Sequence, residues 1–580
     1  MSILDIIIIV AYFVVVIGLG FWYQKRASEN LESYFLSGRS MHWLALAMTG
    51  SVSTFDITGT MWIISLLFLL GMKSMWIHWM WGVMMGAFFM AYMAKWVRRS
   101  NVLTAAEWMV TRFGNDTGGR VARTSYAFMA VVTLSSFIGY AFQGIGKFVA
   151  IYVPYSPSIC AVVIISVTTL YVILGGLYSV VITHVIQTII LTIAAIMITA
   201  VAYFKLTPDL IAAHIPSDWN SLVPQWRLEE LAGTEHAGYE FLGALVIVWV
   251  LKGLLLNAGG PAQMYDFQFF LASRNPRDAA KAGAAWSFFL IVRWGMCAGI
   301  TLLALSGITS VTDPEQVMPI VLKEYLPAGL RGIVVAGLLA AFMSTFSATV
   351  NSAASFVVRD LFQPFFRPDA SERQLVTCSR IATIVIVIIG IAIGYRARSI
   401  AQIWNWIMMA LGAGVLMPNF LRWYWWRMTG WGYAAGILGG ILLSLIALFA
   451  PDAPMYVVFP PICIGSLIAC VGGSYLSAPI GNRILVEFYR TVRPFGLWGP
   501  VKAFASLSQE ELADTSESAA RTLGNTLLGM IAVTGYYLFP IYLVGHWYGS
   551  ALFCIGIAVS ATVILAYTWY PYLPALQEKK

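Results

Sequence analysis

Charged residues are scarce in this chain. Asp, Glu, Lys and Arg together supply 11% of its 580 residues, whereas 59% are hydrophobic and the mean hydropathy is +0.78. A soluble domain usually carries about a quarter of charged residues, so the composition excludes a soluble globular protein and predicts an integral membrane protein. No polar stretch is long enough for a soluble enzyme or signalling domain, which disfavours a solute sensor built on a transporter scaffold.

Cysteine and histidine, the usual metal ligands, are also few and scattered. The six cysteines contain no CxxC pair and lie mostly in apolar runs, which argues against a metal centre or a disulfide framework. The six histidines contain no HExxH motif. A polytopic membrane enzyme is therefore disfavoured, and no catalytic residues are expected.

Long apolar runs are what the chain has in abundance. Runs of roughly 20 residues, the length that crosses a bilayer as a helix, predict about fifteen membrane spans. They cover residues 3–23, 42–70, 74–96, 124–153, 157–175, 178–204, 238–270, 281–308, 331–359, 375–395, 399–421, 431–450, 455–478, 523–546 and 549–572. We therefore predict an all-α polytopic protein in which residues 1–580 form one transmembrane domain in contact with the lipid bilayer.

The basic residues are distributed unevenly between the predicted loops. Loops after odd-numbered spans hold most of the Lys and Arg, for example Lys95, Arg98 and Arg99, whereas the long loop 205–237 is rich in carboxylates. The positive-inside rule then predicts an external N-terminus, a cytoplasmic C-terminus and a cytoplasmic loop at 479–521 in a cell membrane. The net charge of +8 is explained by this topology, and no nucleic-acid partner is expected.

Two of the predicted spans are interrupted by polar, glycine-containing stretches. Residues 43–70 are broken over 49–60, and residues 241–271 are broken over 257–266. Each break carries a carboxylate near mid-depth, where an ionised side chain costs at least ~3 kcal/mol. Unwound backbone at membrane depth is tolerated only where it is buried or lines a cavity. A matched pair of broken helices is typical of the binding site of a secondary transporter.

Each broken helix opens a set of five predicted spans, at 42–204 and at 238–421. An odd number of helices per set places the two sets antiparallel in the membrane, as in an inverted repeat that alternates access to one central site. One extra helix precedes the repeats and about four follow them. The sequence leaves the oligomeric state open, with a monomer as one option.

The ninth span is unusually rich in hydroxyl groups. It contains Ser344, Thr345, Ser347 and Ser352, and positions three and four apart share one face of a helix. One interpretation is a helix-packing face of small residues. The other is a sodium site, because a dehydrated cation needs several oxygen ligands, which hydroxyls and the carbonyls of an unwound helix can supply.

Several short motifs occur in order along the chain. They are SGR at 37–39, TAAEW at 104–108, RFG at 112–114, LGGLYSVV at 174–181, NS at 351–352, RD at 359–360 and WRMTGWG at 426–432. Together they resemble the sodium:solute symporter family, which includes sodium–galactose and sodium–proline carriers. The resemblance covers roughly residues 1–450 and implies a LeuT-like fold, Na+ as the co-transported ion and a small-molecule solute.

The resemblance also implies a sodium site. Its ligands would be the backbone carbonyls of Thr49, Val52 and Ala341 and the hydroxyls of Ser344 and Thr345.

Two further positions depart from the family pattern. His184 stands where many members carry an Asp that helps to hold a second sodium ion, and Ala348 replaces a Ser of that second site. One sodium ion is therefore expected rather than two. A proton-coupling role for His184 and a packing role both remain open.

The same resemblance places solute contacts on both broken helices and on the third span. The predicted solute-binding residues are Asp56, His78, Trp79, Gln263, Tyr265 and Asp266. Other interpretations exist for several of them. Asp56 could cap a helix, His78 could be bonded to a carbonyl, and Asp266 could pair with Lys252 or Arg293.

We therefore predict a sodium-coupled symporter that imports a small polar solute by alternating access. A sugar or polyol is the first choice, because the motif matches are nearest to that branch. An amino acid, a cationic solute or a proton-coupled mechanism remain alternatives.

Overall fold

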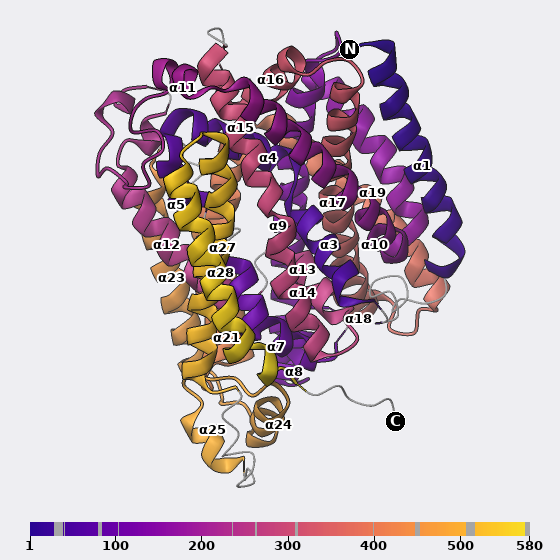
Figure 1. The fold of residues 1–580 in the computed structure, drawn as a ribbon. Coiled ribbons are helices and arrows are strands. Elements are labelled where there is room, and N and C mark those ends of the chain that lie inside the picture. The colour runs from indigo at the N-terminus through magenta and orange to yellow at the C-terminus, as the bar shows by residue number, and fades with distance from the viewer. Residues whose placement is uncertain are drawn as a thin grey trace.

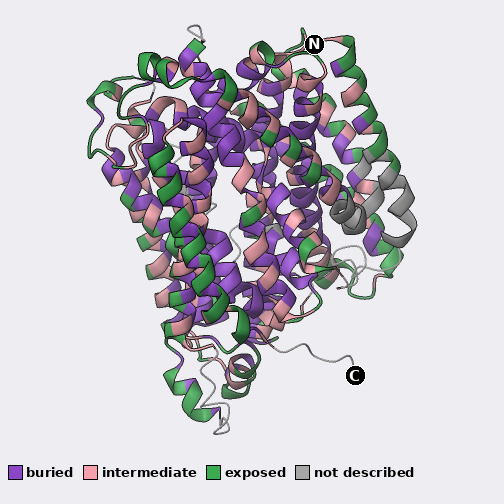
Figure 2. Ribbon diagram, viewed as in Figure 1, coloured by how far each residue is buried: buried purple, intermediate pink, exposed green. Residues whose placement is uncertain are grey.

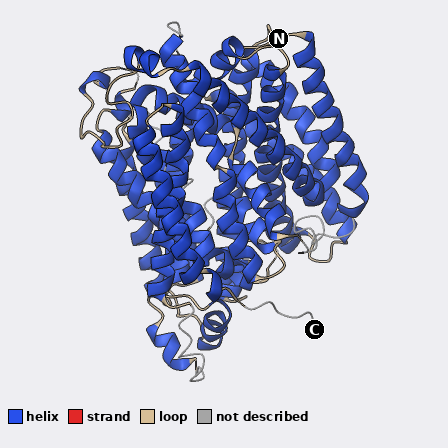
Figure 3. Ribbon diagram, in the orientation of Figure 1, coloured by secondary structure: helices blue, strands red, loops and turns tan. Residues whose placement is uncertain are grey.

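The computed structural model describes residues 1–27, 39, 41–78, 84–102, 104–234, 236–260, 264–307, 311, 313–397, 399–446, 453–505 and 517–574. These residues form helices and connecting loops, with no strand among them (Figures 1 and 3). The predicted all-α polytopic architecture is therefore confirmed.

The first predicted repeat begins with the broken helix. Its helices are α3 (Trp43–Thr54), α4 (Ile57–Leu70), α5 (Met75–His78), α6 (Met84–Phe88), α7 (Ala94–Arg99), α8 (Trp108–Phe113), α9 (Thr117–Ala150) and α10 (Pro157–Lys205). Phe55 and Asp56 separate α3 from α4, inside the predicted break.

The second predicted repeat begins in the same way. Its helices are α12 (Leu242–Ala258), α13 (Met264–Leu271), α14 (Pro276–Phe289), α15 (Ile291–Gly307), α16 (Val317–Tyr325), α17 (Leu330–Ser355), α18 (Gln363–Phe366), α19 (Glu372–Arg396), α20 (Ile400–Asn405) and α21 (Gly412–Tyr424). Helix α12 ends at Ala258 and α13 begins at Met264, both inside the second predicted break.

Further helices flank the two sets. They are α1 (Ile3–Ala27), α11 (Pro208–His214), α22 (Gly430–Ile446), α23 (Met455–Leu476), α24 (Asn482–Val492), α25 (Gly499–Phe504), α27 (Ala519–Val544) and α28 (Tyr548–Thr568). Among the described residues, ten helices are long and apolar enough to cross a membrane. The repeat boundaries themselves stay predictions.

Helix α10 is one helical segment of 49 residues, where the sequence predicts two spans, 157–175 and 178–204. A straight α-helix of this length would extend about 73 Å. That is more than twice the hydrocarbon thickness of a bilayer, roughly 30 Å.

Contacts at both ends of α10 show how this length is accommodated. Just before α10, the Tyr152 hydroxyl donates to the carbonyl of Pro319 in α16 at 3.1 Å. At the other end, the Lys205 ammonium lies 5.7 Å from the ring centre of Tyr325, also in α16. Because both ends meet the same short helix, α10 reverses direction and supplies two antiparallel arms, as the two predicted spans require.

The two ends of the helical body differ in charge. The N-terminus, α11 and α16 lie at one end, and α24 and α25 lie at the other (Figure 1). We call the end with α24 and α25 the basic face, because it carries Arg98, Arg99 and the other arginines of the predicted cytoplasmic loops.

A cluster of ion pairs at the basic face connects the segment before α27 to α7. Glu517, just before α27, lies 2.9 Å from Lys95 and 2.8 Å from Arg99 of α7. Burial alone would raise the pKa of Glu517, but the charges of Lys95 and Arg99 outweigh burial and lower this pKa to about 2. The pair of basic residues therefore holds the segment before α27 against α7.

Burial distinguishes the central helices from the peripheral ones (Figure 2). Most of α17 is buried, whereas α19, α23 and α28 expose large apolar side chains, such as Ile388, Ile468 and Leu552. Exposed apolar side chains on membrane-length helices suit contact with lipid. The broken helix α3–α4 and the hydroxyl-rich helix α17 thus lie inside the protein, away from this outer surface.

Candidate functional site

The first broken helix ends and restarts around Asp56. At the end of α3, the Phe55 amide donates to the carbonyl of Ser51 at 3.0 Å. The Asp56 carboxylate then accepts the Gly59 amide at 2.7 Å and caps the start of α4. Asp is a preferred residue at this position because its side chain satisfies an amide left free by the helix start. The capping interpretation of Asp56 is therefore confirmed, and it leaves the other carboxylate oxygen for a further partner.

Arg293 of α15 is that partner. Its guanidinium lies 3.6 Å from the Asp56 carboxylate and donates to the carbonyl of Thr54, the last residue of α3, at 2.8 Å. The guanidinium also lies over the Phe55 ring, 5.1 Å from its centre. One side chain thus binds both sides of the break, and it compensates the charge of Asp56 inside the membrane region.

The hydroxyl groups of α17 meet the end of α3. Ser344 Oγ lies 3.0 Å from the carbonyl oxygen of Val52 and 2.8 Å from that of Ala341. Thr345 Oγ1 lies 2.7 Å from the carbonyl oxygen of Ser53 and 3.2 Å from that of Ala341. Four of the five predicted sodium ligands are therefore brought together in one cluster of oxygen atoms.

The fifth predicted ligand, Thr49, lies one helical turn earlier in α3. Its carbonyl accepts the Ser53 hydroxyl at 2.8 Å. Thr49 is connected to the oxygen cluster through Ser53, whose own carbonyl is bonded by Thr345.

His184 of α10 lies beside the same cluster. Its Nε2 is 3.1 Å from Ser347 Oγ on α17, and its Nδ1 is 3.5 Å from Ser53 Oγ on α3. The Ser347 hydroxyl in turn donates to the carbonyl of Ser344 at 3.0 Å. His184 is fully buried, and these two distances show that it contacts both helices that carry the predicted sodium ligands.

A small cavity of about 50 Å³ lies next to the break. It is lined by Ser53, Thr54, Asp56, Gly59, Trp62, Ile63, His78, Phe137, Tyr140, Arg293, Trp294, Thr345 and Trp404. The polar part of this lining is the Asp56–Arg293 pair, His78 and the hydroxyl-bearing residues Ser53, Thr54 and Thr345, and much of the rest is aromatic. Ser53 and Thr345 belong both to this lining and to the oxygen cluster, so the two sites share a wall.

His78 faces this cavity without a hydrogen-bond partner among the described residues. The side chain is 3% exposed, and neither ring nitrogen is bonded. The ring packs edge-on against Trp62, with 4.9 Å between the centres, and lies 6.0 Å from Trp294. The alternative of a histidine bonded to a carbonyl is therefore wrong in this structure. A buried, unbonded imidazole is costly, which favours a ligand that bonds it.

The remaining predicted solute residues do not gather here. Asp266 is buried in α13 and is absent from the lining of this cavity. Trp79 and Gln263 lie outside the described residues, as does the side chain of Tyr265. Arg293 pairs with Asp56, which replaces the suggested pairing with Asp266.

Several lining residues carry no sequence signal of their own. Tyr140 and Phe137 lie in the middle of α9, and Trp62 lies in α4, among many other aromatic residues of the chain. Their position shows only when the helices pack: the Trp404 ring lies 5.0 Å from Tyr140 and 5.2 Å from Trp62. Arg293 did carry a signal, because an arginine within an apolar span is a functional candidate.

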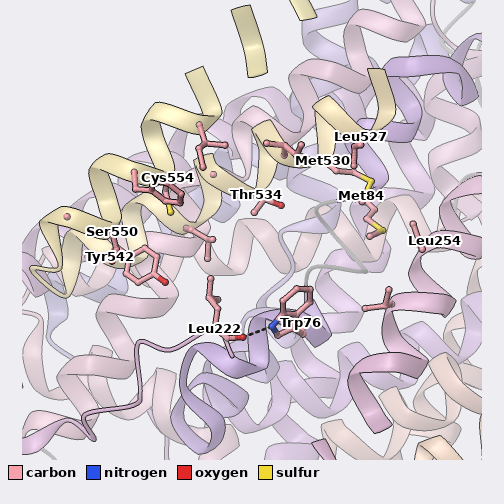
Figure 4. A pocket seen from close by; sticks show the side chains of 17 residues that line it. Trp76, Met84, Leu222, Leu254, Leu527, Met530, Thr534, Tyr542, Ser550 and Cys554 are labelled. Carbon is pink, nitrogen blue, oxygen red and sulfur yellow. Dashed lines mark hydrogen bonds between the residues drawn. The ribbon is translucent and has the colours of Figure 1, made fainter. Parts of the chain in front are cut away.

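A larger pocket of about 730 Å³ lies between α12, α27 and α28 (Figure 4). Its lining is almost entirely apolar, and Leu527 and Phe553 at its edge are exposed. Trp76, which borders it, already donates to the carbonyl of Leu222 at 2.6 Å. The pocket contains none of the predicted site residues, so it is separate from the candidate site.

Comparisons with known proteins agree with this architecture. The model of the sodium:solute symporter family matches residues 34–213 and 284–440, more than half of the chain. A sodium/glucose cotransporter of Vibrio parahaemolyticus is 25% identical over 480 residues, covering 78% of this chain and 86% of its own length. An osmoregulated proline transporter of Bacillus subtilis is 24% identical over 502 residues, covering 82% and 95% respectively.

A solved structure has the same fold. It is a Na+-coupled sialic acid symporter in a substrate-bound outward-open state, with a TM-score of 0.66 and 16% identity over 83% of this chain and 99% of that chain. The expected LeuT-like fold is confirmed by this likeness. The chain therefore belongs to the sodium:solute symporter family, and Na+ is the ion that it co-transports.

Proposed function

We propose that this protein imports a sugar or polyol together with one Na+, and that the oxygen cluster between α3 and α17 binds the ion. The ligands would be the carbonyls of Thr49, Val52 and Ala341 and the hydroxyls of Ser344 and Thr345. The observation that carries the proposal is that Thr345 belongs to both the oxygen cluster and the lining of the cavity.

The oxygen cluster has the chemistry that a sodium ion needs. A dehydrated alkali cation is held by several oxygen dipoles, and carbonyl and hydroxyl oxygens here come from two helices that are far apart in sequence. Both hydroxyls now donate to carbonyls of α3, and each keeps lone pairs for a cation. Binding of Na+ would therefore draw the end of α3 and the middle of α17 to one centre.

The residues that the oxygen cluster and the cavity share, Ser53 and Thr345, would couple sodium binding to solute binding. Sodium that fixes the end of α3 also fixes the carbonyl of Thr54, which Arg293 bonds, and so fixes the Asp56–Arg293 pair. Solute bound to that pair would in return stabilise the same position of α3. Two ligands that favour one conformation bind cooperatively.

The charge balance of the cavity favours an uncharged solute. Asp56 is compensated by Arg293 and by the Gly59 amide, so a cationic solute is not needed to neutralise it. A carboxylate, a guanidinium and an imidazole supply both donors and acceptors for hydroxyl groups. The rings of Trp62, Tyr140 and Trp404 supply flat apolar surfaces, such as those that pack against a sugar ring.

The cavity must enlarge before a solute of this kind can bind. Its volume of about 50 Å³ is far below the roughly 300 Å³ at which ligand pockets begin. Movement of α3 and α4 about the break at Phe55 and Asp56 would enlarge it, since these helices supply much of its lining.

A competition experiment tests the solute class. Purified protein is reconstituted into liposomes under an inward sodium gradient. Radiolabelled neutral sugars and polyols, zwitterionic amino acids and organic cations are then added outside, and their uptake is measured. We expect transport and competition by neutral polyhydroxyl solutes and none by organic cations. Amino acids are the second candidate, because the Asp56–Arg293 pair could separate to bind an ammonium and a carboxylate. Uptake confined to amino acids or to cations would contradict the sugar or polyol assignment.

A further inference from the structure

The contacts of His184 connect three helices at the edge of the oxygen cluster. Nε2 lies 3.1 Å from Ser347 Oγ of α17, and Nδ1 lies 3.5 Å from Ser53 Oγ of α3. All three side chains are fully buried. The imidazole therefore fills the space between α3, α10 and α17.

The direction of the hydrogen bonds follows from the Ser347 hydroxyl. This hydroxyl donates its single proton to the carbonyl of Ser344 at 3.0 Å, so Ser347 Oγ can only accept from the histidine. Nε2 must then carry the single proton of the neutral imidazole. The Ser53 hydroxyl donates its own proton to the carbonyl of Thr49, so the unprotonated Nδ1 contacts Ser53 Oγ without a hydrogen bond. A continuous chain results, in which the imidazole N–H bonds the Ser347 hydroxyl and that hydroxyl bonds the Ser344 carbonyl.

The backbone of His184 reinforces the same arrangement. The Thr188 hydroxyl, one turn along α10, lies 2.7 Å from the carbonyl of His184 and 3.0 Å from the carbonyl of Met48 in α3. On the α3 side, Ser53 is held to the carbonyl of Thr49 at 2.8 Å. The ring and backbone of His184 thus join both halves of the oxygen cluster to α10.

We propose that His184 is a positioning residue for sodium: its imidazole N–H, through Ser347, sets the place of Ser344 and holds α17 at the distance from α3 that Na+ requires. This inference rests on the proposed sodium site. It assigns His184 a role in ion affinity, distinct from both proton transfer and simple packing. Removing a group that hydrogen-bonds to a metal ligand and orients it typically lowers metal affinity by about 10- to 100-fold.

The experiment measures equilibrium binding of radioactive sodium alone to the purified full chain, so no solute has to be known. We expect His184→Ala to raise the sodium dissociation constant about tenfold or more. His184→Gln keeps a side-chain N–H that can reach Ser347, and we expect it to recover most of the affinity. Rescue by the conservative variant separates positioning from packing volume alone.

Gln187 provides the matched control. It lies one turn from His184 in α10, is equally buried and bonds the Tyr12 hydroxyl of α1 at 2.9 Å. Gln187→Leu therefore removes a buried bond between helices without touching the oxygen cluster, and its sodium affinity should equal that of the wild type.

Three results would overturn the inference. One is unchanged sodium affinity in His184→Ala. Another is an equal loss in His184→Ala, His184→Gln and Gln187→Leu, which would indicate general loosening of α10. The third is normal sodium binding by Ser344→Ala, which would remove the proposed sodium site itself, and with it the role of His184. Only this third result concerns the proposed function, so the two failures are distinguishable.

Discussion

Replacing Ser344 by alanine should raise the sodium concentration needed for half-maximal uptake by about tenfold or more. The Ser344 hydroxyl lies within 3.0 Å of two carbonyls, those of Val52 and Ala341, on two different helices. Alanine removes one proposed sodium ligand, and it also removes the bond that holds the end of α3 to α17. Both losses weaken ion binding, while saturating sodium should restore most of the maximal rate.

A buried serine elsewhere provides the comparison. Ser379 in α19 is fully buried, and its hydroxyl bonds the carbonyl of Leu375 within its own helix at 2.9 Å. Ser379→Ala should leave the sodium dependence of uptake unchanged. If Ser344→Ala and Ser379→Ala behave alike, Ser344 does not bind the ion.

Replacing Arg293 by alanine should reduce solute uptake about 100-fold or more. This change leaves the Asp56 carboxylate buried without its cation, which costs about 3 kcal/mol or more in comparable buried pairs, equivalent to ~100-fold in an equilibrium constant. It also frees the carbonyl of Thr54 at the end of α3. The measurement is the initial rate of uptake at saturating sodium per mass of reconstituted protein, together with the fraction that stays folded, because losing the pair destabilises the folded protein as well as the solute site.

A double-mutant cycle tests the pair itself. Asp56→Asn keeps an acceptor oxygen that can cap α4 and removes the charge that Arg293 compensates. The double variant Asp56→Asn/Arg293→Ala contains no isolated buried charge, so it should be more stable to heat than Arg293→Ala alone. Additive losses of stability in the cycle would show that the two residues act independently and would contradict the pairing.

The architecture of the site follows closely from the sequence, because its signals are local. A polar, glycine-containing stretch inside an apolar run marks the break between α3 and α4. Ser344 and Thr345 lie three and four residues after Ala341, which places both hydroxyls near the face of α17 that Ala341 occupies. Backbone positions such as Val52 and Ala341 needed the family resemblance, since any residue type carries a carbonyl.

The ion-pair partners of the charged residues could not be predicted from local sequence patterns. Asp56 and Arg293 lie in different predicted repeats, and nothing in either local pattern indicates which distant side chain will face it. From the sequence, Arg293 is a candidate partner for Asp266, and no pattern connects it with Asp56. Only the packing of α4 against α15 decides between them.

In α10 the observed helix differs from the predicted spans. One helical segment covers both predicted spans, and Gly175 and Gly176 lie at the boundary between them. The prediction of two spans nevertheless holds, because membrane thickness limits the length of a straight helix.

The energy available from one sodium ion sets what the transporter can achieve. One charge that crosses 100 mV contributes ~2.3 kcal/mol, and a tenfold sodium gradient adds ~1.4 kcal/mol. Together, ~3.7 kcal/mol limits the accumulation of a neutral solute to roughly 500-fold.

The most direct test of the central claim is the driving force for uptake into liposomes that contain only this protein. Radiolabelled solute is added under an inward sodium gradient, under an inward proton gradient without sodium, and under no gradient. The sodium-coupled account predicts accumulation above equilibrium with the sodium gradient alone, increased by a negative internal potential. Accumulation driven by the proton gradient and indifferent to sodium would contradict the sodium site and would favour His184 as a proton-coupling group.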